Sequence, residues 1–180
     1  LKADHQSQKF RLEDKLLTKF PAEIQEQTAK IAALKSDAEI ASAHPQNKEN
    51  FCCMVIKGMT YDEKKTAGER LILACMELPN TEEQLVGSYR GFELSLRFDT
   101  FHKEHQALLK GKLKYPVSLS SDPHGNIVRL DNALSSFADR ITAAENELDT
   151  LKQQQADIRS EYGEITANAA RYAVSTTAYK

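Results

Sequence analysis

The most constraining feature of the sequence is a run of apolar residues at alternating spacings of four and three near its C-terminal end. This spacing is the a/d pattern of a coiled coil, in which one stripe of a helix packs against a partner helix. The single polar member, Gln155, is either a register-setting residue or a tolerated one; we favour the second interpretation. The stripe consists of Leu130, Leu134, Phe137, Ile141, Ala144, Leu148, Leu151, Gln155, Ile158, Tyr162 and Ile165, with Ala169 and Tyr172 as its continuation.

A shorter stripe of the same kind lies near the N-terminal end. Pro21 falls within it, and proline lacks a backbone N–H and disfavours a helical conformation at the residue before it. We therefore expect a kink or break at Phe20, with Pro21 in the first turn of a new helix. That helix should end at His44–Pro45, with a polar loop to Asn50. The stripe consists of Leu17, Phe20, Ile24, Gln27, Ile31, Leu34, Ala38 and Ala41.

The apolar pattern between these two arms predicts strands around one helix. Residues 51–57 predict a strand, Gly58–Met59 a tight turn and residues 63–78 a helix, which Thr60 or Asp62 would cap. Its buried stripe would be Ala67, Leu71, Cys75 and Leu78.

From Leu85 onward the apolar period is two, which is typical of strands with one buried face. Alternation over residues 92–98 and 109–120 predicts two such strands, and Pro116 falls on the exposed face of the second, as at a sheet edge. Residues 127–130 predict a short last strand, after which Asp131 or Asn132 would cap the long helix.

The predicted fold class is therefore α+β. Long N- and C-terminal helices would form an antiparallel coiled-coil stalk around a small antiparallel β-sheet with one packed helix. We divide the chain into an N-terminal helical arm (8–44), a small α+β head (51–130) and a C-terminal helical arm (131–172), all within one structural domain. Because the chain begins with Leu1 and stops inside helix-like sequence, we expect it to be a segment of a longer polypeptide.

Composition argues against several classes of protein. The formal net charge is −2, so no global basic field marks a nucleic-acid binder. We interpret Cys52, Cys53 and Cys75 as reduced, buried residues of a cytoplasmic protein, because three cysteines are too few for a disulfide framework. The sequence has no run of about eighteen apolar residues and no signal-peptide pattern, so no membrane contact is predicted.

No catalytic constellation, cofactor motif or metal site is predicted. Residues 87–91 lack the spacing of a phosphate-binding loop, and Gly111–Lys112 lacks the rest of a Walker motif. His102 and His105 could share a helix face as metal ligands. No further ligand stands at a recognisable spacing, so we favour a surface loop for this segment.

A group of basic residues in the middle of the chain allows two interpretations. Residues 85–114 carry six Lys or Arg against three acids, whereas residues 131–165 carry eight acids against three bases. The lysines would lie on one strand face, either protecting a sheet edge from aggregation, which we favour, or following a phosphate backbone. Tyr89 and Phe92 could stack on bases, although Phe92 has the register of the core. The residues concerned are Arg90, Arg97, Lys110, Lys112 and Lys114.

Four strings carry a resemblance to a known family: FCCMVIKGMTY (51–61), AGERL (67–71), GSYRGFEL (87–94) and GNIVRLDNAL (125–134). Over roughly residues 8–160 the chain resembles the C-terminal region of very large proteins of conjugative transposons and related mobile elements. Those proteins join an N6-adenine DNA methylase to a Snf2-type helicase. From about Tyr162 onward the sequence departs from the charged helix of that family. The resemblance implies an accessory module whose partner is the rest of the parent protein. It carries over no catalytic residue, because the Walker A, DEAH-like and NPPY-like motifs are absent.

Our first functional hypothesis is a non-catalytic scaffolding domain of a mobile-element helicase or methylase, with assembly, including a homodimer, through the coiled coil. The second is a DNA-contacting module that uses the basic strand face, and an enzyme in its own right is the least favoured. The seam residues of the first hypothesis are Ile24, Ile31, Leu34, Leu134, Phe137, Ile141, Leu148, Leu151 and Ile158.

Overall fold

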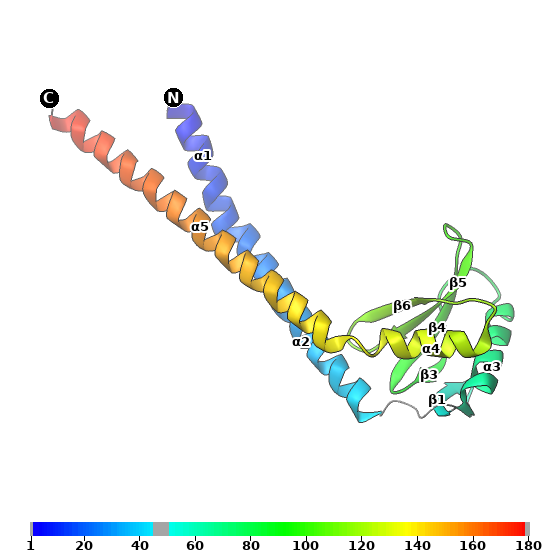
Figure 1. Cartoon of the computed structure of the whole chain (residues 1–180). Coiled ribbons are helices and arrows are strands. Elements are labelled where there is room, and N and C mark those ends of the chain that lie inside the picture. Colours follow the sequence, from blue (N-terminus) through cyan, green and yellow to red (C-terminus); the bar gives the residue numbers. More distant parts are fainter. Residues whose placement is uncertain (1, 45–50, 179–180) are drawn as a thin grey trace. The chain divides into compact units, whose positions relative to one another are not determined.

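The computed structural model describes residues 2–44 and 51–178 and has an α+β architecture (Figure 1). The chain divides into two compact units. Unit 1 contains residues 1–31 and 142–180, and unit 2 contains residues 32–141. The loop expected over residues 45–50 lies outside the described residues.

Unit 1 is helical. The N-terminal part runs from α1 (Lys2–Asp14) through a π-helix, η1 (Lys15–Lys19), into α2 (Phe20–Ala43), and the C-terminal part belongs to α5 (Phe137–Ala178). Hydrogen bonds link the two parts: Gln8 donates to Glu161 at 3.4 Å, Tyr162 donates to Glu13 at 2.6 Å, and Gln27 donates to the Ala144 carbonyl at 3.0 Å and to Glu147 at 3.4 Å.

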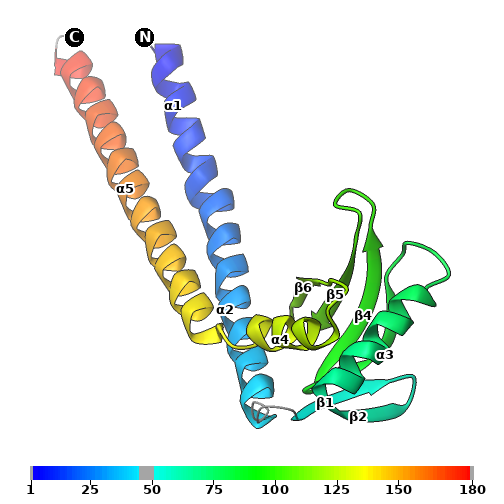
Figure 2. The ribbon, with the colours of Figure 1, turned by 45° about the vertical axis from the view of Figure 1, so that its right-hand side comes forward.

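The helical chain does not break at Phe20, but η1 interrupts the α-helix just before it, and Pro21 lies in the first turn of α2, as predicted. The helix continues from α1 through η1 into α2 (Figure 2). In η1, the Phe20 amide donates to the carbonyl of Lys15, five residues back, instead of the usual four. A proline ring normally collides with the carbonyl four residues before it, and a wider π turn relieves that collision. Helical structure therefore begins well before Pro21 and passes through it.

Unit 2 is built on one six-stranded antiparallel sheet with the order β2-β1-β3-β4-β5-β6. Its buried face carries the core, and the largest fully buried side chains there are Met54, Ile56, Tyr89, Phe92, Leu94, Leu96 and Leu109. Pro116 is exposed on the edge strand β6, as predicted. The strands are β1 (Phe51–Ile56), β2 (Met59–Glu63), β3 (Gln84–Tyr89), β4 (Phe92–Asp99), β5 (Glu104–Lys110) and β6 (Lys114–Ser118).

Two helices, not one, pack in unit 2: α3 (Lys64–Met76) and α4 (Pro123–Ala133) (Figure 2). The two come so close that a Cβ atom on Gly68 would lie 2.0 Å from the Pro123 carbonyl oxygen. Of the predicted stripe, Ala67, Leu71 and Cys75 are buried on α3, whereas Leu78 lies beyond the end of the helix and is half-buried.

Three local predictions for unit 2 were wrong. Residues 59–63 form the strand β2, so Thr60 and Asp62 do not cap a helix. Residues 109–120 form the end of β5, a turn and β6, where one strand was expected. Residues 127–130 belong to α4, whose first position is Pro123, so neither Asp131 nor Asn132 caps α5.

Two buried carboxylates tie distant segments of unit 2 together. Asp37 on α2 accepts hydrogen bonds from the amides of Lys112 and Leu113 and from the Tyr115 hydroxyl. Asp131 on α4 accepts from the Tyr89 hydroxyl and pairs with Arg90 at 3.2 Å. The C-terminal half of α2 and the end of α4 are thereby attached to the sheet.

Candidate functional site

The predicted stripe on α5 is the less exposed side of that helix in unit 1. Ala144 and Ile165 are buried, and every residue between two stripe positions is exposed. The other stripe members are half-buried, so part of each side chain remains accessible: Leu148, Leu151, Gln155, Ile158 and Tyr162. Ala169 and Tyr172 lie where side chains are outside the described part of the structure.

The predicted burial of the N-terminal stripe is confirmed only in part. Phe20, Gln27 and Ile31 are buried and Ile24 is half-buried, as predicted. Leu17 was predicted to face the partner helix but is 78% exposed. The cause is η1, because the wider π turn rotates the preceding residues around the helix axis and brings Leu12 to the buried side.

Several predicted seam residues belong instead to the core of unit 2. Leu34, Leu134 and Phe137 are buried there. The Phe137 ring stacks on Phe92 with centroids 6.3 Å apart and meets the edge of Tyr115 at 5.4 Å. Ile141 is half-buried at the boundary of this unit.

The predicted basic face is not assembled as expected. Arg90 is 5% exposed, and its guanidinium donates to Asp131 and to the carbonyls of Ala41 and His44. Tyr89 and Phe92 are fully buried, so neither can stack on a base.

The remaining basic residues lie around the β5–β6 hairpin and on β4. Arg97 donates twice to Gln106, and Lys114 pairs with Glu83 at 3.0 Å. Lys110 and Lys114 face each other across β5 and β6, whereas Lys112 lies in the turn between them. Lys110, Lys112 and Lys114 are all exposed at this hairpin, and Lys114 is held by its ion pair with Glu83.

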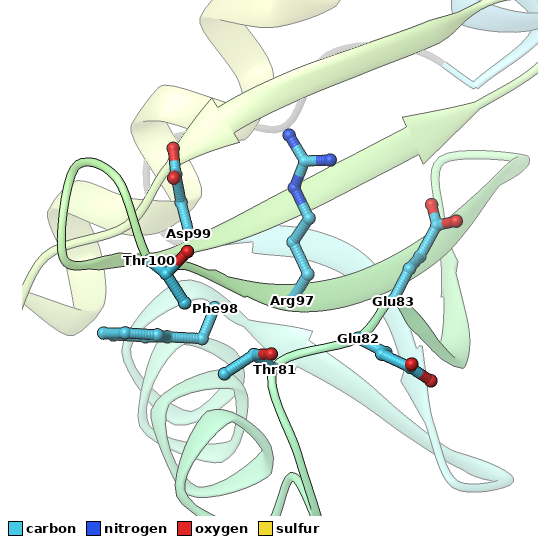
Figure 3. Close-up of a pocket in the computed structure, with 7 residues that line it drawn as sticks. All are labelled: Thr81, Glu82, Glu83, Arg97, Phe98, Asp99 and Thr100. Carbon is cyan, nitrogen blue, oxygen red and sulfur yellow. The ribbon is translucent and has the colours of Figure 1, made fainter.

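A shallow hollow of about 460 Å³ lies beside the end of β4 (Figure 3). Near it, His102 bonds Asp99 at 2.7 Å, which lowers the pKa of the Asp99 carboxyl. His102 is in a turn and His105 is on β5, where it contacts Phe98, so the two do not share a helix face. The hollow is lined by Thr81, Glu82, Glu83, Arg97, Phe98, Asp99 and Thr100.

The three cysteines are free thiols, but they differ in exposure. Burial raises the pKa of Cys52 to about 12, with Asp131 adding to the effect, and raises that of Cys75 to about 11. Cys53 is exposed, which corrects the prediction that all three are buried. Such raised pKa values leave the two buried thiols protonated at neutral pH, so they are poor nucleophiles.

Within the residues that the structure describes, no three His, Cys, Asp or Glu side chains are grouped to hold a metal ion. None of the helices in that same part of the chain is long and apolar enough to cross a membrane. Comparisons with protein-family models, with curated proteins and with solved structures give no match.

Sequence reasoning missed the residues that fasten unit 2, because their partners are far away in sequence. Asp37 bonds residues 75 to 78 positions away, and Arg90 bonds a carboxylate 41 positions away. The only sequence signal was the presence of an acid on the apolar side of the N-terminal arm.

Proposed function

We propose that the chain is a non-catalytic assembly module, in which the two helices of unit 1 pair as an antiparallel coiled coil and the half-buried stripe on α5 is the contact surface. One observation carries this proposal. The residues at four-three spacing from Ala144 to Ile165 are less exposed than every residue between them. A helix whose apolar stripe is only half covered by one neighbour offers surface to another.

The hydrogen bonds of unit 1 support the pairing of these helices. They lie near both ends of the paired segment, at Gln8 and at Gln27, and connect to residues at matching distances along α5. The resemblance to the C-terminal region of mobile-element methylase–helicase proteins supports an accessory role, and we propose the rest of such a parent protein as the physiological partner.

DNA contact receives less support from the side chains. Of the five basic residues considered, Arg90 is buried in an ion pair, Arg97 is bonded to Gln106 and Lys114 to Glu83. Exposed lysines at the tip of a hairpin are also the usual protection of a sheet edge. We therefore place assembly ahead of DNA binding.

The proposal is tested by hydrogen exchange of the full chain. The double variant Leu151→Asp, Ile158→Asp places charges in the stripe and should abolish amide protection in residues 4–31 and 142–168 while leaving unit 2 protected. The matched control, Thr150→Asp with Ser160→Asp, changes exposed neighbours and should keep protection throughout. Unchanged protection in the stripe variant would refute the pairing.

The DNA alternative is tested on the same chain with a labelled DNA duplex at low salt. We expect that the chain does not show the salt-sensitive binding to the duplex that phosphate contacts would give. Salt-dependent binding that is lost in Lys110→Glu, Lys112→Glu would instead favour the DNA-contacting module.

A further inference from the structure

Two large apolar side chains of unit 1 are exposed, Phe10 (71%) and Leu17 (78%). Counting back from Phe20 in steps of three and four reaches Leu17, Glu13 and Phe10. In an uninterrupted α-helix, these residues would therefore continue the stripe of α2 that lies toward α5. In the structure, Leu12 is buried and Leu16 half-buried, and Glu13 is half-buried and accepts a hydrogen bond from Tyr162 of α5, whereas Phe10 and Leu17 are exposed.

The π-helix explains why Leu12 and Leu16 lie on the buried side in place of Phe10 and Leu17. From Leu12 to Phe20 the buried side takes eight residues for two turns, with Leu16 between them, whereas an α-helix needs about seven. The additional residue lies in η1 (Lys15–Lys19). The segment thus has two apolar stripes, one (Leu12, Leu16) used inside unit 1 and the other (Phe10, Leu17) turned outward.

The outward stripe is suited to α5 in particular. Its positions relative to Phe20 are those that would face α5 if the helix had no π turn. The charges are also complementary, because residues 8–20 contain four Lys or Arg against two acids, whereas residues 142–165 contain six acids against two bases. The stripe on α5 is half-exposed from Leu148 to Tyr162 and can accept further apolar contact.

We propose that the stripe formed by Phe10 and Leu17 docks on the α5 helix of a second copy of this chain. This inference rests on the proposed assembly function and adds a second copy of the chain as a partner of the α5 stripe. The second copy offers the same stripe and the same α5 helix, so each chain would contribute both halves of the contact, as in a twofold-symmetric dimer. The helical units would then form a four-helix arrangement in which the half-exposed stripe of each α5 becomes covered.

The test compares the full chain with the double variant Phe10→Ser, Leu17→Ser by sedimentation velocity at increasing micromolar concentrations. The natural chain should dimerise. The variant should raise the dimer dissociation constant by at least about tenfold, because apolar side chains at the centre of an interface carry most of its binding energy. The control Gln6→Ser, Asp14→Ser changes exposed polar positions of the same segment and should dimerise as the natural chain does.

Two results would overturn the inference: a strictly monomeric natural chain, or a Phe10→Ser, Leu17→Ser variant that dimerises normally. Hydrogen exchange of the Phe10→Ser, Leu17→Ser variant distinguishes loss of docking between two copies from loss of helix pairing within one chain. Phe10 and Leu17 are exposed within one chain, so residues 142–168 of the monomeric variant should remain more protected than in Leu151→Asp, Ile158→Asp. Loss of protection to the same extent would mean that Phe10 and Leu17 act within one chain, which would also overturn the docking.

Discussion

The Asp37 carboxylate of α2 lies 2.5 Å from the hydroxyl of Tyr115 on β6, and both side chains are buried. The same carboxylate accepts the amides of Lys112 and Leu113, at 2.6 and 3.1 Å. A single acid on a helix therefore accepts the hydrogen bonds of two backbone amides in the tight turn between β5 and β6. Burial and the bond to Asp37 raise the pKa of Tyr115, so this hydroxyl stays a donor at all ordinary pH values.

Replacing this acid should destabilise unit 2. We expect Asp37→Ala to lower the free energy of unfolding by about 3 kcal/mol, because it leaves two amides and one hydroxyl without their acceptor in a buried place. Urea unfolding of the full chain, followed by circular dichroism, measures the change. The exposed neighbour Glu39→Ala is the control and should change stability by less than about 0.5 kcal/mol. An equal effect of the two substitutions would contradict the role of Asp37.

Replacing Gly68 and Gly163 by alanine should change the stability of the chain in opposite directions. Gly68 on α3 has the Pro123 carbonyl oxygen 2.0 Å from where a Cβ would stand, so Gly68→Ala should force α3 and α4 apart and cost about 3 kcal/mol. Gly163 on α5 has nothing within 4 Å of that position, so Gly163→Ala should stabilise its helix by about 1 kcal/mol. Thermal unfolding of both variants checks the signs, and a stabilising Gly68→Ala would mean that the helices have room to move.

The thiols should react in two classes. At neutral pH, iodoacetamide should modify Cys53 quickly and Cys52 and Cys75 slowly, as read by mass spectrometry of tryptic peptides. Rapid modification of all three would show that unit 2 opens readily.

The raised pKa values of the buried thiols also predict a loss of stability in alkali. A thiol whose pKa is about 11 when folded, against an ordinary 9.0, is neutral in the folded chain while the unfolded chain loses its proton. The unfolded state therefore binds fewer protons above pH 9, and the free energy of unfolding falls as pH rises from about 9 towards 11. The free energy of unfolding of the Cys75→Ala variant should fall less steeply over this pH range than that of the natural chain. Identical slopes would rule out a contribution from Cys75.

The parts of the fold that could be predicted are those encoded locally. The stripe from Ala144 to Ile165 and the alternation of β4 repeat over enough residues for one period to be unambiguous. Residues 127–130 are a short apolar run, which fits a strand or a buried helix equally well, and Pro123 at the first helical position was the signal that could have decided it. The hairpin between β5 and β6 was hidden because alternation continues across its turn at Gly111.

The parts that could not be predicted depend on contacts across the chain. Leu17, Phe20 and Ile24 fit an α-helical stripe perfectly, and only the π turn before Pro21 excludes Leu17 from it. Likewise, Arg90 reads as a surface charge in the sequence, and only its pairing with Asp131 removes it from the basic face. Charge patterns therefore overestimated the candidate nucleic-acid surface.

Gln27 gives a last test of the helix pair in unit 1. Its side chain is 8% exposed, and its amide donates to the Ala144 carbonyl at 3.0 Å and to Glu147 at 3.4 Å. A buried polar residue in a helical seam fixes one alignment of the helices at a cost in stability. We expect Gln27→Leu to raise the free energy of unfolding by about 1 kcal/mol and to allow more than one alignment. Hydrogen exchange of α5 would then show two protected populations, where the natural chain shows one. A less stable Gln27→Leu variant with a single population would mean that the amide contributes net stability and does not select the alignment.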